Sequence, residues 1–161
     1  MRIGVISDTH LTSLNEVVKS VTEIHFADVD IVVHAGDIVD AAILDVFGGR
    51  NVYAVCGNMD LTSVRRTCPQ KLVLEIDWCR IGVIHGWGAP FDIEEKLIKE
   101  FNHIDCLIYG HTHRAANHER GDVLYFNPGS PTDGAFNDQR TVGILEIKEN
   151  KSIKGQIIEL P

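Results

Sequence analysis

A series of short, β-branched apolar runs constrains the fold of this sequence more than any other feature. In the first two thirds of the chain these runs alternate with helical patterns, which is typical of an α/β fold. Nine segments are predicted to be strands: residues 2–7, 31–35, 51–56, 72–76, 80–84, 106–109, 123–126, 141–147 and 153–160. After residue 110 only strands and turns are expected, so a more antiparallel half should follow.

Three helices are predicted between the strands. Ser13 and Glu16 form the pattern of a capping box, which predicts a helix start. A second helix is expected from Asp40 to Phe47, and a third from about Asp92, shortly after Pro90. The expected apolar face of the first helix consists of Leu14, Val17, Val18, Val21 and Ile24, and that of the third of Ile93, Leu97, Ile98 and Phe101.

Size and charge limit the function classes. The chain has 161 residues, of which 44% are hydrophobic, and no linker or repeat, so we expect one domain spanning residues 1–161. The net charge of -8 disfavours nucleic acid or an anionic membrane surface as the main partner.

The N-terminal sequence and the cysteines bear on location. No charged leader precedes an apolar core, and no run approaches the ~20 apolar residues of a membrane span. The four cysteines are widely spaced without a C-x-x-C pair, which predicts free buried thiols: Cys56, Cys68, Cys79 and Cys106. We therefore expect a cytoplasmic protein with no membrane partner.

Metal-binding types of side chain follow five of the predicted strands. They lie in "SDTH" (Asp8, His10), "HAGD" (Asp37), "GNMD" (Asn58, Asp60), "IHG" (His85) and "GHTH" (His111, His113). Because the carboxyl ends of the strands form the ligand-binding crevice of an open α/β sheet, these side chains should converge. The strand ends are therefore the candidate site.

Seven of these residues are predicted metal ligands: Asp8, His10, Asp37, Asn58, His85, His111 and His113. They exceed what one ion with an open position uses and suit two ions that share a carboxylate, for which we choose Asp37. Nitrogen and oxygen ligands without thiolate favour transition metals over calcium or magnesium alone. The predicted cofactors are two divalent ions, with manganese as first choice and nickel, iron, cobalt or zinc as alternatives.

The motifs D-x-H, G-D, G-N-x-D, H-G and G-H-T-H, in this order, resemble those of the calcineurin-like metallophosphoesterases. The short length and "NPGSPT" (residues 127–132) are similar to its small branch of YfcE-like and MJ0936-like phosphodiesterases, which is related to the retromer subunit Vps29. The resemblance covers residues 1–147. It implies a four-layer αββα sandwich of two facing mixed β-sheets, with a dinuclear metal site at one edge.

The resemblance also implies roles for the candidate residues. One ion would be held by Asp8, His10, Asp37 and His113, and the other by Asp37, Asn58, His85 and His111. The ions would share a hydroxide that attacks the phosphorus of a small phosphodiester in line. Asp37, Asn58 and His85 are therefore the expected catalytic residues, and Asp60 is expected to orient a ligand or an imidazole. Dimers or tetramers are the assemblies that the resemblance suggests.

Met59 departs from the family pattern, because many larger members have a histidine at this place in the motif. That histidine is thought to stabilise the transition state or to protonate the leaving group, and a thioether can do neither. We therefore predict a preference for activated leaving groups, and for small, accessible phosphodiesters over alkyl monoesters.

Other residues have competing interpretations. His34 lies in an apolar run and is predicted to be a buried, hydrogen-bonded histidine, while His118 is predicted to lie in a solvated loop. Cys56 either ends a buried strand or faces the site, and Trp87 either walls the pocket or belongs to the core. Asn127 and Gly129 are expected in a turn and are candidates to support the site loops.

Two other functions compete with the phosphodiesterase. A Vps29-like scaffold would use the same fold to bind proteins, with vestigial activity; relatives of that kind lose ligand histidines, whereas this sequence keeps them. An amidohydrolase-type metallohydrolase also carries an H-x-H pair, but its barrel needs ~250 residues. The complete ligand set therefore favours a metal-dependent phosphodiesterase.

Overall fold

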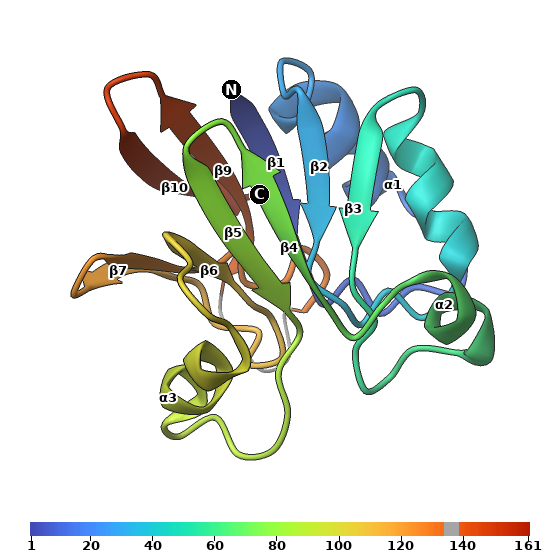
Figure 1. The fold of residues 1–161 in the computed structure, drawn as a ribbon. Coiled ribbons are helices and arrows are strands. Elements are labelled where there is room, and N and C mark those ends of the chain that lie inside the picture. Colours follow the sequence, from blue (N-terminus) through green and yellow to red (C-terminus); the bar gives the residue numbers. More distant parts are fainter. Residues whose placement is uncertain (134–138) are drawn as a thin grey trace.

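The computed structural model describes residues 1–133 and 139–161, which form two five-stranded sheets (Figure 1). The first sheet has the order β10-β9-β1-β2-β3 and the second the order β4-β5-β6-β8-β7. The strands of the first sheet are β1 (Arg2–Ile6), β2 (Ile31–His34), β3 (Asn51–Ala54), β9 (Arg140–Lys148) and β10 (Ser152–Leu160). Those of the second sheet are β4 (Lys71–Ile76), β5 (Cys79–Ile84), β6 (Cys106–Ile108), β7 (Ala116–Arg120) and β8 (Val123–Asn127).

Both sheets are mixed. In the first, β1, β2 and β3 run parallel, while β9 runs antiparallel to β1 and to β10. In the second, β5, β6 and β8 run parallel, and β4 and β7 pair antiparallel at its edges. The carboxyl ends of β1, β2, β3 and β5 point to the same end of the molecule, where the loops carry the predicted ligands (Figure 1).

The helices lie outside the two sheets. The first sheet is covered by α1 (Glu16–Ser20), the π-helix η1 (Val21–His25) and the 3-10 helix η2 (Ala41–Phe47). The second is covered by α3 (Ile93–Leu97) and the 3-10 turn η3 (Ile98–Glu100). A short helix, α2 (Thr62–Thr67), lies between β3 and β4 in sequence. None of the described helices has the length and apolarity that crossing a membrane requires.

Buried apolar clusters hold the layers together. Between the sheets, Val5 and Val33 pack with Ile81, Ile108 and Phe126 from the opposite sheet. A second cluster joins the first sheet to its helices, and a third joins the second sheet to α3. Helix, sheet, sheet and helix thus form four layers, as predicted, because each sheet has two apolar faces to bury.

The capping box predicted at Ser13 is wrong. Helix α1 begins two residues later than predicted, because the Asn15 side chain accepts a hydrogen bond from the Val18 amide at 3.0 Å. Leu14 and Ile24 accordingly fall off the buried face and are 43% and 67% exposed. Two predictions were closer: Asp40 caps η2 through the Ala42 amide, although the helix is 3-10, and α3 begins after Asp92.

Two elements were missed, and other predictions are confirmed. Strand β7 and helix α2 were both predicted to be loop. His118 therefore lies in a strand and not in a solvated loop, and its ring stacks on Tyr125.

His34 is buried, with its Nε2 3.1 Å from the Thr9 hydroxyl, and burial lowers its pKa to about 3. All four cysteines are buried free thiols, as predicted.

Candidate metal centre

The site is built from the loops that follow β1, β2, β3, β5 and β6. These loops are joined by backbone hydrogen bonds, including Asp8 N to Gly36 O and His10 N to Asp37 O, both 3.0 Å. Five of the predicted ligands have positive φ angles, between 49° and 69°: Asp8, His10, Asp37, His111 and His113. Residues with side chains adopt this region rarely, and such strain is concentrated at functional sites.

One group of candidate ligands consists of Asp8, His10 and His113, whose ligand atoms lie within 4.8 Å of one another. His113 Nε2 is 3.3 Å from Asp8 Oδ1 and 3.0 Å from His10 Nε2. Asp8 is fully buried, and its carboxylate also accepts hydrogen bonds from Ser7 Oγ and the His111 amide. This group therefore gathers one carboxylate and two imidazoles around one point.

The other group consists of Asp8, Asp37 and His85. Asp37 Oδ2 lies 3.3 Å from His85 Nε2 and 3.7 Å from His10 Nε2, so this oxygen reaches toward both groups. Its other oxygen accepts a hydrogen bond from the Met59 amide at 2.7 Å. Asp8 belongs to both groups, whereas the sequence analysis chose Asp37 alone as the shared carboxylate; both stay candidates for that role.

The tautomers of His85 and His113 fit a bound cation. His85 Nδ1 donates to the Ala35 carbonyl at 2.8 Å, and His113 Nδ1 donates to the Asp133 carboxylate. In the neutral rings both Nε2 atoms therefore present lone pairs to Asp8 or Asp37. His85 Nε2 is buried and makes no hydrogen bond within the described part of the chain. Facing lone pairs repel one another unless a cation lies between them, so these residues fit a metal ion.

The raised pKa values of His113 and His85 also indicate that the site favours a bound positive charge. Hydrogen bonding to Asp8, together with Asp133, raises the pKa of His113 to about 9 against the effect of burial. Burial lowers the pKa of His85, but its contact with Asp37 and the charge of Asp8 outweigh burial and raise it. A proton and a divalent ion are alternative cations here, so the carboxylates that hold the proton also favour the ion.

Asn58 and His111 lie together at the outer side of the site. His111 Nε2 donates to the Gly88 carbonyl at 2.8 Å, which leaves Nδ1 facing Asn58 Oδ1 at 3.0 Å. The role expected for Asp60, to orient a ligand or an imidazole, stays a prediction. Its carboxylate accepts hydrogen bonds from the Val39 and Gly57 amides, both 2.6 Å, and so ties together the loops after β2 and β3.

Glycines let these loops approach closely. A Cβ on Gly57 would lie 2.2 Å from Asp37 Oδ1, and one on Gly110 would lie 2.8 Å from Asp8 Oδ2. Side chains at these positions would occupy space that the carboxylates already fill.

Three residues at the end of β8 and in the segment that follows it support the site. Asp133, which the sequence analysis missed, contacts His113 Nδ1; its position directly after "NPGSPT" was the available signal. Asn127 supports the loop of His111 and His113, because its amide nitrogen donates to Gly110 O at 3.0 Å and to Thr112 Oγ1 at 3.1 Å. Gly129 likewise accepts a hydrogen bond from Ser7 through its carbonyl.

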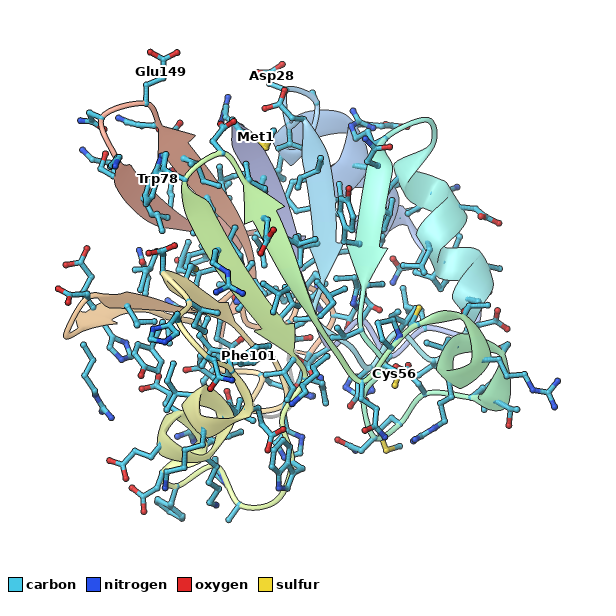
Figure 2. The ribbon with its side chains drawn as sticks, viewed as in Figure 1. Met1, Asp28, Cys56, Trp78, Phe101 and Glu149 are labelled. Carbon is cyan, nitrogen blue, oxygen red and sulfur yellow. The ribbon has the colours of Figure 1, made fainter. Side chains whose placement is uncertain are left out.

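A cavity of about 410 Å³ opens beside the metal centre and includes Asn58 and His85 in its wall. Trp87 lines it and is 47% exposed, so this side chain belongs to the pocket and not to the core. Cys56, which is labelled in Figure 2, is buried just beyond the end of β3 but lines the same cavity. Burial raises the pKa of its thiol, which is therefore neutral at pH 7.

Comparisons with known proteins agree with this geometry. A family model for the calcineurin-like phosphoesterase superfamily domain matches residues 1–150. "Probable metallophosphoesterase MJ0623" from Methanocaldococcus jannaschii is 42% identical over 82% of this chain and 69% of its own length. "Phosphodiesterase MJ0936" from the same organism is 30% identical over 99% of this chain and 100% of its own.

Solved structures share the fold. One described as a novel archaeal phosphodiesterase has a TM-score of 0.77 and 29% identity, and covers 98% of this chain and 100% of that one. A Vps29 structure from Entamoeba histolytica covers all of both chains with a TM-score of 0.71; at 23% identity it is evidence for the fold alone. The chain therefore belongs to the calcineurin-like phosphoesterase superfamily and is a metal-dependent phosphoesterase.

Proposed function

We propose that this protein hydrolyses small phosphodiesters with two divalent ions bound in the strand-end loops. The residues proposed to hold them are Asp8, His10, Asp37, Asn58, His85, His111 and His113. The observation that carries the proposal is the convergence of two buried carboxylates on three imidazole Nε2 atoms, in two overlapping groups. The relative named as a phosphodiesterase, which aligns over its whole length, supports diesters as the substrate class.

When bound, two such metal ions supply an activated water as nucleophile and stabilise charge on the phosphoryl oxygens. The protein's own residues fix the geometry. Asp37 and Asp8 provide the negative charge that retains the ions, and His85 is held in one tautomer by the Ala35 carbonyl. Asn58 and His111 close the site on the side of the cavity, so a substrate bound there would lie next to the ions.

The proposal includes manganese as the ions in the cell, because the donor set combines imidazole nitrogens with carboxylate and amide oxygens and lacks thiolate. Cys56 is the cysteine that reaches the cavity, and among the described residues it belongs to neither group of candidate ligands. Nickel, iron, cobalt and zinc remain the alternatives in the test below.

A cytoplasmic location is also proposed, supported by four buried cysteines that are free thiols, as expected in a reducing compartment. Assembly into dimers or tetramers stays a prediction.

A Vps29-like scaffold is the competing function, since Vps29 structures share the fold. The enzyme is favoured because every ligand type that the chemistry needs is present, and because the site carries backbone strain at five ligand positions.

The proposal is tested with chelator-treated protein, assayed on bis(p-nitrophenyl) phosphate and on p-nitrophenyl phosphate before and after addition of Mn²⁺. We expect Mn²⁺ to restore cleavage, with the diester preferred over the monoester, and the same addition of Ni²⁺, Fe²⁺, Co²⁺ or Zn²⁺ to restore less. Tight metal binding without cleavage of either ester would favour the scaffold.

A further inference from the structure

The cavity beside the metal centre has a charge that the proposed chemistry does not use. Its wall includes two cations, Arg65 and Lys71, and one carboxylate, Glu100. Lys71 Nζ lies 2.7 Å from Glu100 Oε2, so these two charges compensate each other. Arg65 has no carboxylate within ion-pair distance in residues 1–133 and 139–161. The cavity therefore contains one uncompensated positive charge, in a chain whose net charge is -8.

Arg65 is fixed in position beside the metal centre. Its Nε donates to the Asp60 carbonyl and its Nη2 to the Asn58 carbonyl, both at 2.8 Å. Because both acceptors are neutral carbonyl groups, they do not neutralise the charge of the guanidinium. The N–H groups of Nη1 are not used in these two bonds and can donate to a ligand. The same charge acts on Cys56 across the cavity, where it opposes the effect of burial on the thiol.

Trp87 provides a flat apolar wall in the same cavity. Its side chain is half-exposed, and Ile84 and Gly86 line the adjoining surface. Exposed tryptophan in a pocket is a stacking surface for flat rings. A volume of about 410 Å³ accommodates one ring with its substituents.

We propose that this cavity binds one ester arm of the substrate, an aromatic ring bearing an acidic group, with the ring on Trp87 and the acidic group on Arg65. This inference rests on the proposed phosphodiesterase function and adds its specificity. Arg65 acts as a specificity-determining residue, since a planar guanidinium pairs with a carboxylate or a phosphate through two parallel hydrogen bonds. Carboxylate and phosphate substituents share this chemistry, and the test separates them.

The test measures binding separately from catalysis. In the Trp78→Phe variant the remaining tryptophan is Trp87, whose fluorescence reports occupancy of the cavity. The metal-loaded variant is titrated with phenyl phosphate, 3-carboxyphenyl phosphate and 1,3-phenylene bisphosphate. Arg65→Gln and Arg65→Lys are made in this background, with Arg66→Gln as the matched control, because Arg66 is an exposed neighbour on α2 outside the cavity wall.

We expect both acidic ligands to bind about fivefold more tightly than phenyl phosphate, the size of a partly exposed charge-assisted contact. Of 3-carboxyphenyl phosphate and 1,3-phenylene bisphosphate, the ligand that binds more tightly identifies the acidic group as a carboxylate or a phosphate. Arg65→Gln should abolish the preference, Arg65→Lys should retain part of it, and Arg66→Gln should leave it unchanged. A purely structural role of Arg65 would instead weaken all three ligands equally and overturn the inference, as would a wild-type protein without preference.

Cleavage of bis(p-nitrophenyl) phosphate by the same proteins separates this inference from the proposed function. Cleavage by the wild type without any acidic-ligand preference overturns the specificity alone. An Arg65-dependent preference in a protein that cleaves no ester, with any of the five metals, overturns the phosphodiesterase function while the binding assignment holds.

Discussion

The two groups of candidate ligands are built differently although they share Asp8. In the inner group, Asp8, Asp37 and His85 are all buried, with side-chain exposures of 0%, 3% and 2%. In the outer group, the side chains of His10 and His113 are 29% and 18% exposed. The members of the inner group lie close to the strand ends and make backbone contacts, whereas His10 and His113 lie farther past the ends of β1 and β6, and His113 contacts Asp133. One site thus combines a rigid half with an accessible half.

This difference predicts unequal roles. The inner group should keep its arrangement without a metal, because the Ala35 carbonyl and the Met59 amide hold its members in place. The outer group should lose affinity more easily, because its imidazoles are partly hydrated. Changes in the inner group should therefore remove catalysis, while changes in the outer group should weaken one ion.

The largest effect is expected for Asp37→Asn. It preserves volume but removes the charge that faces both His85 and His10, so ester hydrolysis should fall about 10³-fold, corresponding to several kcal/mol of lost stabilisation. Initial rates with Mn²⁺ measure this. Asp45→Asn, which removes an exposed carboxylate from η2, is the matched control and should retain wild-type rates. Activity within a few-fold of wild type in Asp37→Asn would refute the role of the inner group.

Met59→His sharpens the comparison by adding an acid next to the inner group. The Met59 amide donates a hydrogen bond to Asp37, and the residue is 57% exposed, so an imidazole fits there. We expect turnover of alkyl esters and monoesters to rise about 100-fold, at the lower end of general-acid effects, with little change for p-nitrophenyl diesters. Met59→Gln controls for polarity. Unchanged turnover of poor leaving groups would count against a missing acid.

Asp133→Asn should break the outer group alone. Without the carboxylate, His113 loses the partner that fixes its tautomer, so affinity for one of the two ions should fall between about 10- and 100-fold. Calorimetric titration with Mn²⁺ resolves the two binding events, and Asp122→Asn, an exposed carboxylate in the turn before β8, is the control. Equal weakening of both ions would show that the two groups are not separable.

The smallest expected effect is a pH dependence of the free energy of unfolding that is caused by His34. Its pKa is about 3 in the folded chain and near 6.5 when unfolded, so the unfolded chain binds more protons between these values. This contribution to the free energy of unfolding is present above pH 6.5 and is lost as the pH falls. Relative to His34→Gln, the metal-free wild type should lose about 1 kcal/mol between pH 7 and pH 5.5 in urea unfolding. Parallel pH dependence in the two proteins would contradict this, since the other histidines are common to both.

Much of the fold and the gathering of the ligands could be predicted from the sequence, because both follow from strand ends. The alternating runs placed the strands, and parallel strands bring Asp8, Asp37 and Asn58 to one edge regardless of their separation in sequence. His34 could be distinguished from the ligand histidines in the sequence only because its neighbours are apolar.

The misses occurred where local patterns compete with tertiary contacts. The pattern at Ser13 predicted a helix start there, but Asn15 caps α1 instead, because its side-chain oxygen accepts a hydrogen bond from the Val18 amide. Strand β7 is mostly polar and exposed, and it exists because it pairs with β8, so no hydrophobic pattern marks it. Asp133 directly follows the motif "NPGSPT", but the motif does not show that the Asp133 side chain contacts His113, which lies in another loop.

The most direct test of the central claim is to count the Mn²⁺ ions bound per chain and follow diester hydrolysis at each step of the titration. The account predicts two ions per wild-type chain, with hydrolysis appearing as the second ion binds, and loss of both properties in Asp37→Ala. Full activity with a single bound ion, or two bound ions that survive Asp37→Ala, would contradict it.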